Sequence, residues 1–177
     1  KNYYVYDENE PSEEVFIYGF HVDPSESDPS QAVTYLADAV GKTPAAMGSS
    51  TFSYGDWADA FFMPKPCMLK YDGTVDYYLN PNDYTKKADG TASDVANSSY
   101  GGNAMMEWGQ NGYKIWYKIV PDEDDEYSAT VYVANKQVDS DYVAWSFMNY
   151  NGTYKTHFYT AIYEGYVDSN NRLRSLS

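Results

Sequence analysis

Three strand-like runs separated by two turns dominate the middle of this chain, over residues 104–134. Asn111-Gly112 lies between the first two runs, and Asn-Gly favours a tight hairpin because both central residues of a primed turn need positive φ. Residues 113–120 alternate between two faces, which is the period of a half-buried antiparallel strand, and residues 127–134 alternate in the same way. We therefore expect a three-stranded antiparallel meander at the centre of the sheet.

The clearest helix signal precedes this region, over residues 28–41. Asp28 is suited to the N-cap, Pro29 to the first helical position and Gly41 to the stop. Between them the apolar residues follow at spacings of three and four, at Val33, Leu36, Ala37 and Val40. This pattern predicts an amphipathic helix that packs on one face of the sheet.

The remaining patterns predict one shorter helix and several further strands. Residues 55–62 are expected to be helical, with Trp57 directed inward. A continuous apolar run indicates a buried strand over 15–22. Two turn signals, Asp72-Gly73 and Asn151-Gly152, predict hairpins that join 67–71 to 75–79 and 142–149 to 154–163.

Together these elements predict an α+β fold, in which one amphipathic helix packs on a strand-dominated antiparallel sheet. The length of 177 residues suits one domain. We expect an N-terminal arm over residues 1–14, a single domain over 15–167, and a connector over 168–177 that leads to a further C-terminal part.

The chain is rich in aromatic residues, with 21 tyrosines, seven phenylalanines and four tryptophans, which favours strands over helices. So many amphipathic rings indicate an aromatic surface that stacks on a sugar or a partner protein. The candidate ligand-binding residues fall on successive expected strands, and they are Trp108, Trp116, Tyr132, Trp145 and Tyr159. Two alternatives stay open: the rings line a polar sheet face without a ligand, or a second sheet or neighbouring subunit covers them.

The net charge of the chain limits the classes of partner that it can bind. Twenty-six acidic residues against 12 basic ones give a net charge of −14, which repels phosphate backbones and anionic lipid surfaces, so we expect no nucleic-acid partner. The lone Cys67 excludes an internal disulfide, and its apolar neighbours indicate a small buried hydrophobe. No run approaches the ~18–20 apolar residues of a membrane-spanning helix, so we expect no membrane insertion.

Chemistry-bearing motifs are few. The acidic run 121–126 lacks the spacing of a Ca²⁺-binding loop, so we interpret it as a solvated hairpin loop. A second group of loop carboxylates, in which side chains from 76–94 converge on Ca²⁺, gives the weak metal candidates Asp76, Asp83, Asp89 and Asp94. His21 and His157 are interpreted as structural histidines and not as general bases. We expect no enzyme, and no cofactor except this Ca²⁺.

Five strings in the chain resemble a known group of viral proteins. They are AVTYLADAVG at 32–41, which follows Asp28-Pro29, YGDWADA at 54–60, PCMLKYDGTVDYYL at 66–79, NDYTKK at 82–87 and LRSLS at 173–177. They are similar to strings in tail or minor structural proteins encoded by phages and prophages of gut Firmicutes. The resemblance runs from about residue 17 to the end. In that group this region precedes a part that looks like a C-type lectin or formylglycine-generating enzyme, a scaffold for recognising host surfaces.

The resemblance implies a virion-associated protein of the phage tail that is extracellular when it acts on the host. The first hypothesis is a tail-fibre or adhesin domain that binds, or supports binding to, a host surface glycan or protein. The analogy with tail fibres also implies other virion proteins as partners and a homo-oligomer, with a trimer favoured. The alternative is a virion assembly or capsid-decoration module without a ligand, and a third hypothesis is a polysaccharide depolymerase. No catalytic residue can be carried over.

Overall fold

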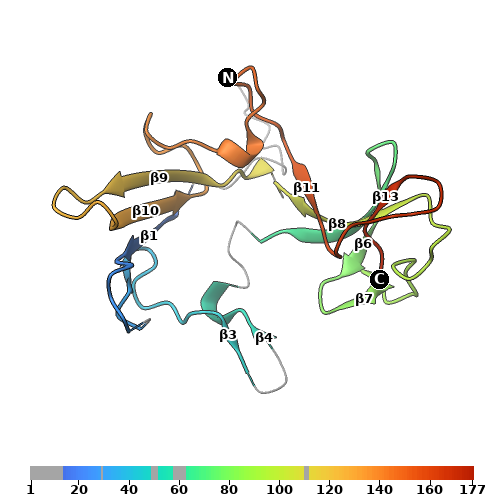
Figure 1. The fold of residues 1–177 in the computed structure, drawn as a ribbon, viewed down its shortest axis with the longest axis horizontal. Coiled ribbons are helices and arrows are strands. Elements are labelled where there is room, and N and C mark those ends of the chain that lie inside the picture. Colours follow the sequence, from blue (N-terminus) through green and yellow to red (C-terminus); the bar gives the residue numbers. More distant parts are fainter. Residues whose placement is uncertain (1–13, 29, 49–51, 58–62, 110–111) are drawn as a thin grey trace, which may run out of the picture. The chain divides into compact units, whose positions relative to one another are not determined.

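The computed structural model describes residues 14–28, 30–48, 52–57, 63–109 and 112–177. These residues form two compact units, in which strands and turns predominate (Figure 1). Unit 1 draws its residues from Lys1–Met63 and Asn111–Thr156, and unit 2 from Pro64–Gln110 and His157–Ser177. No helix in the described part of the chain is long and apolar enough to cross a membrane.

Unit 1 is built on a four-stranded antiparallel sheet with the order β2-β1-β10-β9. The strands are β1 (Ile17–Val22), β2 (Val33–Ala37), β9 (Trp116–Pro121) and β10 (Ala129–Ala134). β9 and β10 form the predicted hairpin (Figure 1). In it Ala129 lies opposite Pro121, and Ala134 lies opposite Trp116. The described residues of the unit also include the short strands β3 (Ala46–Met47) and β4 (Phe52–Ser53) and the 3-10 turns η1 (Gly55–Trp57) and η3 (Trp145–Phe147).

The predicted amphipathic helix over 28–41 is wrong, because this segment forms turns and the edge strand β2. The Asp28 side chain accepts hydrogen bonds from the backbone and hydroxyl of Ser30, so it closes a turn instead of capping a helix. β-Branched and aromatic residues at 33–35 suit a strand, and pairing with β1 decides the outcome. The strand-dominated antiparallel part of the prediction is confirmed.

Gly19 has no side chain, and this allows β2 and β10 to lie close to β1 on its two sides. A Cβ at Gly19 would lie 2.8 Å from Cβ of Leu36 and 3.0 Å from the ring of Tyr132. The glycine therefore makes room for both neighbours in the sheet. Beside this point the small core of unit 1 contains Tyr18 and Trp57, whose rings meet edge to face at 5.1 Å. Trp57 is buried, as predicted, while residues 58–62 of the second predicted helix lie outside the described residues.

Unit 2 is built on a five-stranded sheet with the order β11-β8-β5-β6-β7. Its strands are β5 (Lys65–Lys70), β6 (Val75–Asn80), β7 (Asp83–Lys87), β8 (Gly102–Trp108) and β11 (Phe158–Ala161), and a separate two-stranded ribbon contains β12 (Tyr166–Val167) and β13 (Leu173–Arg174). The hairpin predicted around Asp72-Gly73 is confirmed by the pairing of β5 with β6. Cys67 is fully buried, as predicted.

The predicted three-stranded meander is wrong in its first strand. β8 pairs with β5 and β11 in unit 2, whereas β9 and β10 belong to the sheet of unit 1. The Asn111 position of the predicted first turn lies outside the described residues. Of the strand pair predicted around Asn151-Gly152, the turn and a single bridge between Met148 and Tyr154 are present, and residues 158–161 pair with β8.

The chain end is packed into unit 2. Leu176 is 6% exposed and lies in a core cluster with Met68, Leu79, Val95 and Ala104. The backbone of Ala104 donates to the carbonyl of Ser175 at 2.8 Å, and Ser177 donates to Val95 at 2.8 Å. Residues 174–176 are thus part of the unit's core, and the connector to a further part stays a prediction. The single domain over 15–167 and the arm over 1–14 also stay predictions.

Candidate functional site

The predicted aromatic candidates divide between the two units. Three of them, Trp116, Tyr132 and Trp145, lie in unit 1. Trp116 on β9 meets the ring of Tyr154 edge to face at 4.9 Å. Tyr132 on β10 lies across Gly19, so its ring serves the packing of the sheet.

Trp145 stands apart because 59% of its surface is exposed. It lies at the start of η3, at the base of a hairpin that we call the Trp145 hairpin, residues 145–155. Tyr150, which the sequence interpretation did not select, lies in the turn of this hairpin and is fully exposed. Large aromatic side chains are highly buried on average. Two exposed aromatic side chains on one short motif therefore mark this part of the surface as a candidate binding site.

The Trp145 hairpin holds its shape through local hydrogen bonds. The backbone of Asn149 donates to Thr153 at 2.7 Å, and that of Lys155 donates to Phe147 at 2.7 Å. The side chain of Asn151 accepts from the backbone and hydroxyl of Thr153. Phe147 is fully buried and anchors the hairpin to the unit. The exposed rings therefore project from an ordered support, which lowers the entropy cost of binding.

The other two candidates, Trp108 and Tyr159, lie on opposite faces of the sheet in unit 2. Trp108 on β8 stacks on Phe158 with ring centroids 5.9 Å apart, and its indole donates to the hydroxyl of Thr160 at 2.9 Å. Tyr159 is next to Phe158 on β11, so the alternation of a strand directs it to the other face. The two residues therefore do not contribute to one ligand site.

Tyr159 belongs to a cluster across four strands that we call the Glu107 row, residues Lys65, Tyr78, Glu107 and Tyr159. Glu107 on β8 lies directly opposite Lys65 on β5 and Tyr159 on β11. The hydroxyl of Tyr159 donates to one carboxylate oxygen of Glu107 at 3.0 Å, and that of Tyr78 donates to the other at 3.2 Å. The Nζ of Lys65 lies 3.5 Å from the ring centroid of Tyr78.

Burial and the Glu107 carboxylate set the protonation of the neighbouring groups. Burial, together with hydrogen bonding to Glu107, raises the pKa of Tyr159, and burial with the nearby Glu107 charge raises the pKa of Tyr78. Burial and the same charge raise the pKa of the Cys67 thiol to about 12. Both phenols therefore remain hydrogen-bond donors at neutral pH, and Cys67 is not a thiolate nucleophile.

Sequence reasoning missed Lys65, Tyr78 and Glu107 as members of this row. Alternation within each strand places a residue on a face, but the row depends on which strands are neighbours. β11 joins β8 from about 50 residues further along the chain, as the register of Phe158 with Trp108 shows. No short-range pattern in the sequence predicts that β11 pairs with β8.

The four weak metal candidates do not meet at one point in the structure. Asp83 and Asp89 each accept from the backbone and hydroxyl of the threonine two residues later, which closes their own turns. Asp76 binds Lys70 at 2.8 Å, and Asp94 accepts from the Tyr77 hydroxyl at 2.8 Å. The described ranges contain no group of three or more His, Cys, Asp or Glu that could hold a metal ion. Calcium binding stays a prediction.

The acidic loop 122–128 joins β9 to β10, and one of its carboxylates accepts hydrogen bonds from within the loop. Asp125 accepts from the backbone of Tyr127 at 3.0 Å and from the hydroxyl of Ser128 at 2.6 Å. The loop begins beside His21, whose Nε2 lies 2.9 Å from the carboxylate of Asp122. This contact fits the structural role expected for His21. The exposed His157 meets Tyr159 edge to face at 5.3 Å.

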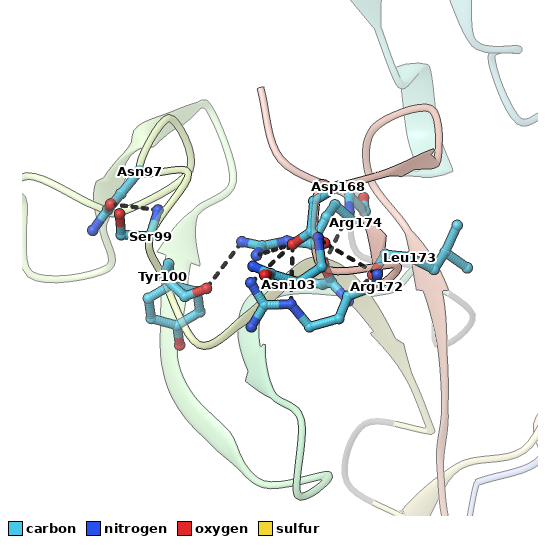
Figure 2. A network of polar contacts seen from close by, with 10 residues as sticks. Asn97, Ser99, Tyr100, Asn103, Asp168, Arg172, Leu173 and Arg174 are labelled. Atoms are coloured by element: carbon cyan, nitrogen blue, oxygen red, sulfur yellow. Dashed lines mark hydrogen bonds and ion pairs between the residues drawn. The ribbon is translucent and has the colours of Figure 1, made fainter.

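Unit 2 also contains a polar network around Arg174, which is 1% exposed (Figure 2). Its guanidinium donates to the Tyr100 carbonyl at 2.9 Å and to Asp168 at 3.3 Å, and Arg172 donates to the same carboxylate (Figure 2). Burial raises the pKa of Asp168, but hydrogen bonds from Arg172 and Asn170 outweigh it and lower the pKa to about 2. This network secures the chain end by ion pairing.

Comparison with known proteins yields no relative from which a role could be transferred. No model of a protein family, no curated protein and no solved structure matches the chain.

Proposed function

We propose that this chain is a non-enzymatic tail-fibre or adhesin domain of a bacteriophage virion, which binds, or supports binding to, a glycan on the host bacterial surface. The phage assignment rests on the sequence resemblance. The binding assignment rests chiefly on one observation, the exposed Trp145 and Tyr150 on an ordered hairpin. Aromatic rings present a flat apolar face for the C–H face of a sugar at low conformational cost.

The charge of the chain is consistent with this proposal. A net charge of −14 disfavours binding to polyanions, so a neutral or amine-bearing glycan fits better than a phosphate-rich polymer. The non-enzymatic part of the proposal has its own test. Incubation with host wall glycans should release no reducing ends, and their release would indicate a depolymerase.

Binding to host cells tests the proposal with single substitutions. We expect Trp145→Ala and Tyr150→Ala each to weaken binding by about tenfold or more, as is typical when an aromatic anchor is truncated. Tyr127→Ala is the matched control, because Tyr127 is 71% exposed in unit 1 but lies in the β9–β10 loop. Wild-type chain that does not bind host cells, or equal losses in all three variants, would contradict the binding assignment.

A second candidate function, a virion assembly or capsid-decoration module, is favoured by exposed apolar residues on the ribbon of unit 2. Val167 is 65% exposed and Leu173 is 68% exposed. Such side chains would be covered at a subunit contact. Multi-angle light scattering tests this candidate. A strictly monomeric chain that binds host glycan would count against a module whose exposed residues are covered at subunit contacts, and it would also contradict the trimer suggested by the tail-fibre analogy.

A further inference from the structure

We propose that unit 2 carries a separate binding site, at the Glu107 row, for a protonated amino group such as that of an amino sugar. The choice of a glycan as the source of the amine rests on the proposed function. The site itself rests on the geometry of the Glu107 row and does not involve Trp145.

Two tyrosines hold the carboxylate of Glu107 in position. Tyr78 and Tyr159 each donate one hydrogen bond to it, at 3.2 Å and 3.0 Å, from strands on either side. The raised pKa of each phenol means that the donors keep their protons at neutral pH. The carboxylate is held by two phenol hydroxyls, and the face of the Tyr78 ring is offered to a cation in the same row. A negative charge near an aromatic face is a combination that binds organic cations.

An ammonium group of the chain itself already occupies the Glu107 row. The Nζ of Lys65 lies 3.5 Å from the centroid of the Tyr78 ring, well within the range of a cation–π contact. The Lys65 side chain is exposed and flexible, so a ligand amine can replace it on the ring. Lys65 therefore acts as an internal competitor for the site.

The Glu107 row suits an organic cation better than an anion or a metal ion. Phosphate and carboxylate ligands would meet Glu107 and a chain with a net charge of −14. A metal ion has a poor ligand set, because the described stretches provide no cluster of three or more suitable side chains. An organic ammonium needs only one carboxylate and an aromatic face, and both are positioned by paired strands, not by loops.

Titration with D-glucosamine, followed in ¹H–¹⁵N correlation spectra of the full chain, tests the proposal. We expect saturable shifts of the amide signals of the Glu107 row, and no saturable shift with D-glucose, which has a hydroxyl in place of the ammonium. Glu107→Gln should weaken glucosamine binding by about tenfold, and Tyr159→Phe should weaken it less. Lys65→Met should strengthen binding by about two- to fivefold because it frees the Tyr78 ring, whereas Lys86→Met, on β7, should change nothing.

Different results would overturn the site itself and the choice of a glycan as its ligand. No shift with glucosamine, equal shifts with glucose, or unchanged binding in both Glu107→Gln and Tyr159→Phe would overturn the site. Tighter binding of Nα-acetyl-lysine methylamide than of glucosamine would overturn the glycan assignment in favour of a protein amine. Failure here is distinguishable from failure of the proposed function, because Trp145→Ala should lose binding to host cells and keep the response to glucosamine.

Discussion

At the scale of single residues, aspartate is used mainly to close turns. In repeated cases the carboxylate accepts from the backbone and hydroxyl of the serine or threonine two residues later, as in Asp23, Asp28, Asp72, Asp83 and Asp89. These hydrogen bonds lower the pKa of each aspartate. At least five of the 26 acidic residues therefore have a local structural role. An Asp-x-Ser/Thr pattern in this chain indicates a turn in preference to a metal site.

Asp168 gives the clearest prediction for pH dependence. We expect Asp168→Asn to lower the free energy of unfolding at neutral pH, because the buried Arg174 loses its carboxylate partner. The folded pKa of about 2 lies below the ordinary 3.8, so the ionised group stabilises the fold above the ordinary value. That contribution is lost as the pH falls towards about 2.

Urea unfolding at a series of pH values measures this effect. The difference in stability between wild type and Asp168→Asn should shrink between about pH 4 and about pH 2. Asp124→Asn, at an exposed position in the β9–β10 loop, serves as the control and should leave the profile unchanged. A constant difference across this range would contradict the assigned role of Asp168.

At the scale of elements, close approach of β5 and β8 depends on Gly102. A Cβ at this position would lie 2.1 Å from the carbonyl oxygen of Leu69, which is backbone and cannot move aside easily. We expect Gly102→Ala to destabilise the chain by about 2 kcal/mol or more in urea unfolding. Gly101→Ala is the matched neighbour, because its Cβ would meet nothing within 4 Å. Equal effects of the two substitutions would contradict this pairing.

The C-terminal segment provides a second matched pair. Leu176 is 6% exposed in the core of unit 2, whereas Leu173, on β13, is 68% exposed. We expect Leu176→Ala to cost about 2–4 kcal/mol of unfolding free energy, and Leu173→Ala less than about 0.5 kcal/mol. Similar values from denaturant titration would show that the segment does not pack as described.

The elements that sequence patterns predicted correctly are those governed by short-range signals. The hairpins β5–β6 and β9–β10 follow from turn residues and alternation, and both are present. The helix over 28–41 failed because the spacing of apolar residues resembled a helix while residues 33–35 favoured a strand. Partner choice decided that case, since Gly19 leaves space for β2 beside β1.

At the scale of the whole molecule, strands that are consecutive along the chain do not always belong to the same sheet. β8 and β9 are consecutive strands along the chain, yet each belongs to a different unit. The candidate aromatics were dispersed for the same reason: Trp145 and Trp116 lie in unit 1, and Trp108 and Tyr159 lie on opposite faces in unit 2. The amino-acid composition therefore predicted an aromatic-rich surface. The positions of the aromatic residues relative to one another depended on which strands pair.

We propose that the chain recognises host glycan through Trp145. The most direct test of this proposal is a fluorescence titration with polysaccharide purified from the host wall, since Trp145 is the most exposed of the tryptophans in the described residues. We expect a saturable change of tryptophan emission in the wild type and in Tyr127→Ala, and no change in Trp145→Ala. An unchanged emission in the wild type, or an equal response in Trp145→Ala, would contradict recognition through Trp145.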